Sequence, residues 1–321
     1  MHNIRHLKPA GKAIFEDRHT KKAKELLTEW SSQGAEAEFG LVGLPLSKPS
    51  ISHSGASFAP GTIRSSLQSY STYSNEEGFD LTASIIDFGD LNMNPTDVVG
   101  NQERLYEGMS DIFQTKASKN WFILGGDHSI SYSSIKAYAE HYSSFGVIQF
   151  DAHHDLRNTE DGGPTNGTPF RRLLEDDLLK GKNLVQIGIR DFTNAKAYDD
   201  YAKEQGVTVY TMGDVNEQSL TSILKKEVQN LAEKVNHIYI SLDMDVLDQA
   251  FAPGCPAIGP GGMDSTSLLE GIHLVAKHEK VNALDIVEID PTIDFRNMTS
   301  RVAAYTMLQF MKGKKLLKST D

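Results

Sequence analysis

The chain has 321 residues, of which 39% are hydrophobic and 23% charged, a composition typical of globular proteins. Asp and Glu outnumber Lys and Arg by 43 to 32, and this net charge of -11, with no strongly basic block, argues against nucleic-acid or membrane-surface binding. One cysteine excludes a disulfide framework, and without a leader-like N-terminus or an apolar run of ~20 residues we expect a cytoplasmic protein with a single domain over residues 1–321.

Short apolar runs alternate with longer segments of helical pattern along the chain. The eight strand candidates cover residues 39–44, 84–88, 121–124, 145–150, 184–189, 207–210, 238–242 and 283–289. Helical periodicity is clear over residues 131–142 and 219–235. Apolar strands that alternate with helices indicate a three-layer αβα domain with a central parallel sheet of about eight strands. Such sheets bind ligands beyond the carboxyl ends of their strands.

Two long polar segments, residues 47–61 and 158–169, interrupt this alternation. The first is rich in serine, and the second is rich in glycine, threonine and proline. Loops of this length inside a compact domain usually form active-site walls or lack a fixed structure. The sequence leaves both interpretations open.

Acidic and imidazole side chains directly follow three of the strand candidates. They are His128 after residues 121–124, Asp151, His153 and Asp155 after residues 145–150, and Asp243 and Asp245 after residues 238–242. Alternate residues of an extended segment share a face, so Asp151, His153 and Asp155 are expected to converge on one point. Each piece taken alone occurs often as an ordinary polar turn. Their coincidence at three strand ends indicates a metal site.

Four carboxylates and two imidazoles are too many for one tetrahedral zinc ion. Their four negative charges balance two divalent cations that share bridging carboxylates. Oxygen-rich ligation mixed with imidazole favours Mn2+, although ligand chemistry leaves Fe, Co and Ni open. The pattern therefore predicts a binuclear hydrolase with two divalent metal ions, most simply Mn2+, and a small-molecule substrate.

The three segments resemble the signature segments of the ureohydrolase family, which contains arginase, agmatinase and formimidoylglutamase. Residues 55–64 and 285–288 extend the resemblance over most of the chain. The resemblance implies one metal held by His128, Asp151, Asp155 and Asp243, and a second held by His153, Asp151, Asp243 and Asp245. It also implies that hydroxide generated at the metals attacks a planar C=N carbon while Glu288 pairs with the amidine-type cation. A homo-oligomer is implied as well.

Differences from the arginase pattern narrow the range of expected substrates. Asn166 stands where arginase and agmatinase place a histidine, and because asparagine cannot titrate, the proton-transfer role is either vacant or filled by another group such as His154 or water. Arg157 stands where arginases have a neutral polar residue, and it offers a bidentate donor for a carboxylate. With residues 252–257, these features resemble formimidoylglutamase, which implies hydrolysis of N-formimidoyl-L-glutamate to L-glutamate and formamide.

Several assignments stay open. We expect Arg157, Asn166 and Arg190 to contact the substrate, with Arg190 at the second carboxylate. An ion pair between Arg190 and Asp191 or a neighbouring acid is an equal alternative. Cys255 either lines the pocket or is a buried, unreactive thiol. The rival functions are another ureohydrolase, such as an agmatinase, arginase or guanidino-acid hydrolase, and a non-catalytic metal-binding protein on the same scaffold.

Overall fold

The computed structural model describes Leu7, residues 17–31 and residues 36–317. Within these residues, nine parallel strands form one sheet in the order β1-β5-β2-β6-β11-β10-β7-β8-β9. Their bounds are β1 Leu27–Glu29, β2 Ala37–Leu44, β5 Ile85–Asp90, β6 Ser118–Gly125, β7 Phe145–Phe150, β8 Leu184–Ile189, β9 Thr208–Thr211, β10 His237–Asp243 and β11 Val281–Val287. A separate antiparallel pair joins β3 (Tyr73–Ser74) to β4 (Phe79–Asp80).

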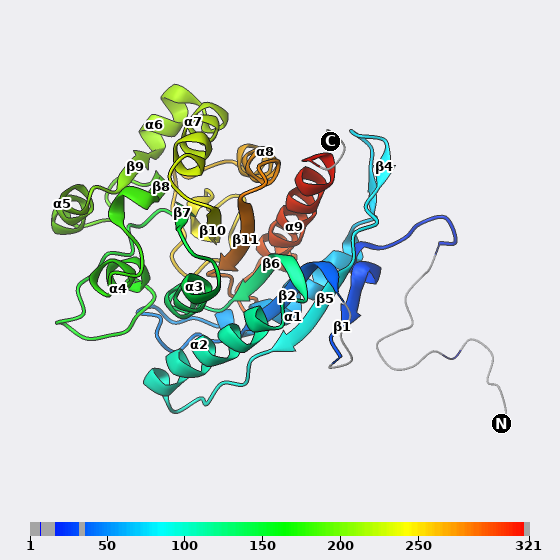
Figure 1. Ribbon diagram of the computed structural model, residues 1–321, viewed down its shortest axis with the longest axis horizontal. Coiled ribbons are helices and arrows are strands. Elements are labelled where there is room, and N and C mark those ends of the chain that lie inside the picture. The colour runs from blue at the N-terminus through cyan, green and yellow to red at the C-terminus, as the bar shows by residue number, and fades with distance from the viewer. Residues whose placement is uncertain (1–6, 8–16, 32–35, 318–321) are drawn as a thin grey trace.

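Helices cover both faces of the sheet (Figure 1). One face packs against α2 (Val98–Gln114), α3 (Ile130–His141), α4 (Pro169–Glu175) and α5 (Lys196–Gln205). The other face packs against α1 (Ala59–Ser66), α6 (Met212–Gln218), α7 (Leu220–Ala232), α8 (Ser265–Ala276) and α9 (Met298–Leu317). Short 3-10 turns are η1 Ala23–Leu26, η2 Ala56–Phe58, η3 Leu67–Ser69, η4 Gly181–Asn183, η5 Met244–Val246 and η6 Phe295–Asn297. The predicted three-layer αβα architecture is confirmed.

The eight predicted strands are all present, with ends that differ by at most three residues. The ninth strand, β1, was not predicted because it has only three residues, two of them exposed, and is defined by its pairing with β5. β7 and β8 are buried at every residue, as expected for strands with helices on both sides. No helix in the described part of the chain has the length and apolar character needed to cross a bilayer.

The sheet order brings distant parts of the sequence together at one edge. β6, β11, β10 and β7 are consecutive neighbours in the middle of the sheet and all run in the same direction. Their carboxyl ends therefore lie side by side, and these ends carry the acidic and imidazole residues singled out in the sequence. The polar cluster is assembled by topology, not by one local motif.

Candidate metal centre and active site

His128 follows β6 in a turn that requires glycine at Gly126. A Cβ built there would lie 2.0 Å from the carbonyl oxygen of Leu46. The same turn is fixed by a hydrogen bond from the backbone N–H of Asp127 to that oxygen, at 2.7 Å. Only a residue without a side chain lets the two segments approach so closely. The double glycine of the sequence thus places His128 at the centre of the site.

The Nδ1 atom of His128 faces three carboxylates. It lies 2.9 Å from Asp155 Oδ2, 3.1 Å from Asp151 Oδ2 and 3.2 Å from Asp243 Oδ2. The atom is buried, yet none of these contacts has hydrogen-bond geometry. A buried imidazole nitrogen beside three carboxylate oxygens offers the donor atoms that a divalent cation binds.

The opposite nitrogen of His128 fixes its tautomer. Ser241 donates its hydroxyl hydrogen to the carboxylate of Asp285 at 2.9 Å, so its oxygen must accept from His128 Nε2, which lies 3.0 Å away. Asp285 also accepts hydrogen bonds from Ser131 and Tyr239. With Nε2 protonated, Nδ1 of a neutral His128 presents a lone pair to the three carboxylates. A histidine held in this way is typical of metal sites.

A second group of potential ligands adjoins the first. His153 Nδ1 lies 3.0 Å from Asp245 Oδ2 and 3.4 Å from Asp151 Oδ1. The two oxygens of Asp151 therefore face different histidines, Oδ2 toward His128 and Oδ1 toward His153. Potential metal-ligand atoms gather in two groups, one of His128, Asp151 and Asp243 and the other of Asp151, His153 and Asp245. Asp151 belongs to both.

The buried carboxylates of this cluster repel one another, and added positive charge would stabilise them. Burial, with the neighbouring charge of Asp151, raises the pKa of Asp155 to about 6, and burial raises the pKa of Asp243 well above its usual range. Burial opposes a charge on His153, but Asp245 and Asp151 outweigh it and raise the pKa of that imidazole to about 12. Protons on the cluster offset repulsion between buried carboxylates. Divalent cations can replace those protons, so the donor set fits a metal centre.

The backbone after β7 differs from the sequence-based expectation. Residues 151–155 are not an extended segment, because the chain bends at Ala152 and His153 and Asp155 has a left-handed backbone with φ of 53°. Asp151, His153 and Asp155 still reach one site, but a tight turn brings them there. The prediction of alternating side chains on a strand end is therefore wrong in its geometry, although the convergence that it predicted is present.

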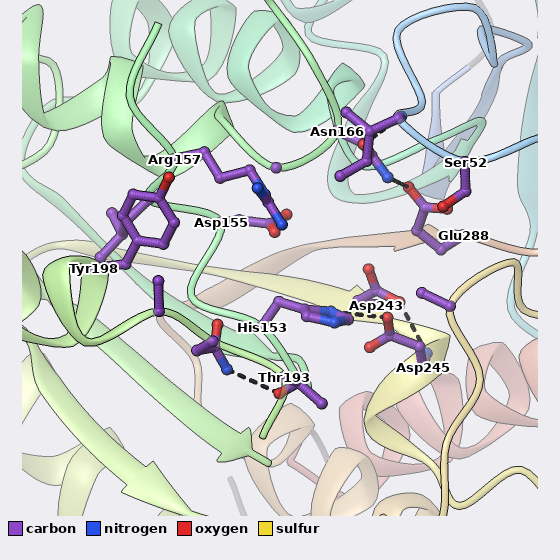
Figure 2. Close-up of a pocket in the computed structure, with 16 residues that line it drawn as sticks. Ser52, His153, Asp155, Arg157, Asn166, Thr193, Tyr198, Asp243, Asp245 and Glu288 are labelled. Atoms are coloured by element: carbon purple, nitrogen blue, oxygen red, sulfur yellow. Dashed lines mark hydrogen bonds and ion pairs between the residues drawn. The ribbon is translucent and has the colours of Figure 1, made fainter. Parts of the chain in front are cut away.

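Glu288 occupies the pocket wall after β11, and Figure 2 shows it beside Asn166. Its Oε1 accepts hydrogen bonds from the backbone N–H of His128 at 2.8 Å and from the side-chain amide of Asn166 at 3.0 Å. The other oxygen, Oε2, is buried and has no hydrogen-bond partner. Burial, with the charge of Asp127, raises the pKa of Glu288 to about 8. A cationic ligand in the pocket would supply the missing partner.

Asn166 joins the two long polar segments to this wall. Its backbone N–H donates to Pro49 at 3.2 Å, and its side-chain oxygen accepts from the backbone N–H of Ile51 at 3.1 Å. Ile51, Ser52, Asn166 and Gly167 all line the pocket. Residues 47–61 and 158–169 therefore both contribute to the wall of the pocket, which was one of the two interpretations left open by the sequence.

Arg157 lines the same pocket and is exposed (Figure 2). Its backbone N–H donates to the carbonyl of Gly167 at 2.9 Å, and its stem passes so close to Gly167 that a Cβ there would lie 2.6 Å from Arg157 Cδ. The guanidinium carbon is 5.9 Å from the centre of the Tyr198 ring. Among the described residues of the pocket lining, Arg157 is the one lysine or arginine.

Arg190 does not take the predicted place. Its side chain is buried, does not line the pocket, and donates to the carbonyl of Gly259 at 2.7 Å and to the carbonyl of Asp245 at 3.0 Å. Both partners are main-chain oxygens, so the guanidinium braces the loop after β10. Neither of its hydrogen bonds goes to Asp191, and binding of the second substrate carboxylate by Arg190 stays a prediction that this placement does not support.

Several pocket residues were missed by the sequence analysis. Thr193, Asn194, Ala195 and Tyr198 follow β8 and line the wall near Arg157. Their position after a strand end was the signal that could have found them. Two residues left open are now placed away from the pocket lining: His154 is buried among polar groups, and Cys255 is a buried thiol whose pKa burial raises well above its usual value.

A nine-stranded parallel sheet with this acid and histidine cluster at its carboxyl ends defines a hydrolase of the arginase fold. A model of the arginase family matches residues 37–312, and the chain belongs to this family. It is 57% identical over 303 residues to a formimidoylglutamase of Halalkalibacterium halodurans. The matched region covers 94% of this chain and 95% of that protein.

Solved structures show the same likeness. The crystal structure of formimidoylglutamase from Bacillus subtilis superposes with a TM-score of 0.92 at 48% identity, over 97% of this chain and 96% of that one. A Trypanosoma cruzi formiminoglutamase with Mn2+2 shares the fold with a TM-score of 0.82 at 22% identity, over 92% of this chain and 98% of that one.

Proposed function

We propose that this protein hydrolyses N-formimidoyl-L-glutamate to L-glutamate and formamide with two Mn2+ ions in the pocket of Figure 2. The observation that carries the proposal is the carboxylate of Asp151, which belongs to both groups of potential ligands. Members of both groups, Asp243 of one and Asp245 of the other, line the same pocket as Glu288 and Arg157. The identity of 57% to a formimidoylglutamase over nearly the whole chain supports this substrate above other ureohydrolase substrates.

The acidic and imidazole residues hold the cations in this proposal. His128, Asp151, Asp155 and Asp243 would hold one ion, and His153, Asp151, Asp243 and Asp245 would hold the other. Two such ions would supply a hydroxide nucleophile at neutral pH and would stabilise the negative charge that develops during attack on the C=N carbon. The Mn2+2 named for the T. cruzi structure concerns that protein, and oxygen-rich ligation supports the same metal here.

Glu288 and Arg157 orient the substrate. The unpartnered Oε2 of Glu288 accepts a hydrogen bond from the formimidoyl cation, while Asn166 and the backbone of His128 keep Oε1 in place. Arg157 binds a carboxylate of the glutamate portion as a bidentate donor. A substrate with a cation at one end and carboxylates at the other matches a pocket with a buried acid and an exposed arginine.

A substrate screen tests the proposal. The full-length protein is stripped of metal, reloaded with Mn2+ and assayed with N-formimidoyl-L-glutamate, L-arginine, agmatine and guanidino acids. We expect turnover of N-formimidoyl-L-glutamate with a kcat/KM at least a hundredfold above the others. Preferred turnover of a guanidino substrate would favour another ureohydrolase. No turnover of any substrate by protein with two bound metals would favour the non-catalytic alternative.

The single domain over residues 1–321, the cytoplasmic location and a homo-oligomeric state also remain proposals. The extent of the sheet and its two helical layers supports the first, and the family resemblance supports the last. Light scattering after size-exclusion chromatography measures the mass of the assembly and would contradict the homo-oligomer if it gave the mass of one chain.

A further inference from the structure

A chain of buried polar side chains leads from His154 to the metal centre. His154 Nδ1 lies 2.7 Å from Gln186 Oε1, Gln186 Nε2 donates to Gln149 Oε1 at 2.7 Å, and Gln149 Nε2 donates to Asp151 Oδ2 at 2.7 Å. Each of these four residues is at most 2% exposed. Burying neutral polar groups so completely is costly unless their hydrogen bonds are satisfied.

The sheet sets the spacing of this chain. Gln149 lies in β7 and Gln186 lies in β8, and the two are direct partners in the register of these parallel strands. Every other residue of the two strands is also buried, and all ten of these others are apolar or glycine. Burying a glutamine pair inside two otherwise apolar strands costs folding free energy, which indicates that the pair has a role beyond packing.

The direction of the hydrogen bonds is fixed by their partners. Gln186 Nε2 also donates to the backbone carbonyl of His154 at 2.7 Å, and Gln149 Nε2 also donates to the carbonyl of His153 at 3.3 Å. Since carbonyl oxygens only accept, neither amide can be turned over. Gln186 Oε1 must then accept, so His154 carries its proton on Nδ1. All the donors of the chain point toward Asp151.

The end of the chain determines how Asp151 is held. Gln149 donates to Oδ2, the oxygen that faces His128, while the backbone N–H of His153 donates to Oδ1 at 2.6 Å. The carboxylate is therefore held at both oxygens and cannot rotate about its Cβ–Cγ bond without losing a hydrogen bond. This orientation presents one oxygen to each group of potential metal ligands.

We propose that Gln149, Gln186 and His154 are positioning residues that lock the Asp151 carboxylate in the orientation needed to bridge two cations. The proposal rests on the two-metal function proposed above. Groups that hydrogen-bond to metal ligands commonly change metal affinity by about 10- to 100-fold when they are removed. Gln149 acts on Asp151 directly, while Gln186 and His154 act on Asp151 through Gln149.

Mn2+ affinity of the metal-stripped, full-length protein is the test. Isothermal titration calorimetry gives the number of bound ions and their dissociation constants for wild type, Gln149→Met and Gln186→Met, since methionine keeps the length of glutamine but neither donates nor accepts comparably. We expect the weaker Mn2+ site to lose about 10- to 100-fold in affinity in Gln149→Met and a smaller factor in Gln186→Met. The electron paramagnetic resonance signal of two coupled Mn2+ ions should weaken in the same order.

His154 provides a rescue pair. Asparagine places an amide donor near the position of His154 Nδ1, so His154→Asn should bind Mn2+ nearly as wild type does, whereas His154→Leu should behave like Gln186→Met. Asn101→Leu is the matched control, because Asn101 is a buried, hydrogen-bonded amide that contacts Asn94 at the start of α2. It should lower the melting temperature of the metal-free protein without changing Mn2+ affinity.

The outcomes separate this inference from the proposed function. If wild type binds two Mn2+ ions and the glutamine variants bind them equally well while only losing thermal stability, the chain is structural and the inference is overturned. If wild type binds fewer than two ions, the two-metal function fails and the inference fails with it. Loss of affinity in Gln149→Met with no loss in Asn101→Leu supports it.

Discussion

The two sides of the pocket are built differently. On the metal side, the residues at the ends of β6, β7 and β10 are buried, apart from the partly exposed His153, and each meets several partners, as His128 and Asp243 do. On the opposite side, Arg157 and Ser52 project from loops and are exposed. Strand ends fixed by the sheet suit chemistry that needs exact distances between charges. Loops that can change length and sequence suit recognition of the substrate tail.

The two sides of the pocket should therefore respond differently to substitution. A change to a carboxylate or histidine of the metal cluster is expected to disturb the metals and abolish the reaction, whereas a change in a loop is expected to alter the substrate preference and spare the metals. Four variants test this difference, beginning with the one expected to have the greatest effect.

Asp151→Ala should have the largest effect, because it removes the carboxylate that both groups of ligands share. We expect both metals to be lost and kcat/KM to fall roughly 10^4-fold, as measured by elemental analysis and steady-state assay. Asp97→Ala, which removes the N-cap of α2, is the control and should keep both metals. Full metal content in Asp151→Ala would contradict the bridging role.

Glu288→Gln keeps the size of the side chain and removes its charge. Since hydrogen bonds to charged groups contribute about 1.5–3 kcal/mol, kcat/KM should fall roughly 10- to 150-fold with metal content unchanged. Glu227→Gln is the control, because Glu227 is also buried but bonds to Tyr210 and Asn230 away from the pocket. An equal loss in the two variants would show that Glu288 acts through stability alone.

Arg157→Ala tests the loop side. We expect KM to rise about tenfold, with kcat and metal content nearly unchanged, as lost ground-state binding of a carboxylate predicts. Arg171→Ala is the control, because Arg171 pairs with Glu175 and stacks on Tyr201 without lining the pocket. The assignment fails if Arg157→Ala lowers kcat and releases metal as Asp151→Ala does.

Arg190→Met should have the smallest effect on the reaction. The loss of two hydrogen bonds to backbone carbonyls should lower the free energy of unfolding by about 2 kcal/mol, while KM changes less than about twofold. Thermal denaturation and steady-state kinetics on the same sample measure both. A KM rise comparable to that of Arg157→Ala would restore Arg190 as a substrate-binding residue.

Sequence patterns predicted the sheet well for physical reasons. β7 and β8 were predicted with their observed bounds, since each is an apolar run, interrupted by a single glutamine, between polar turns. β1 was missed because a three-residue edge strand has no periodicity of its own. Its identity comes from a partner far away in the sequence, which no local pattern reveals.

The sequence predicted which residues form the site better than it predicted how their side chains are directed. Parallel strands collect their carboxyl ends at one edge, so the position of His128, Asp151 and Asp243 after strands placed them together. The direction of a side chain beyond a strand end depends on the turn that follows. Arg190 therefore turned into the protein, and Tyr198 reached the pocket from α5 without any motif.

The backbone of Glu288 has a φ of 61°, a left-handed conformation that disfavours residues with a side chain. It is held there by a hydrogen bond from its N–H to the carbonyl of Gly126 at 3.0 Å. A glycine would adopt this conformation at no steric cost. Glycine at this position would also remove the buried acid proposed to bind the substrate cation, and with it the two hydrogen bonds that Oε1 accepts from His128 and Asn166. The strained backbone at residue 288 is therefore expected to be retained for the reaction rather than for stability.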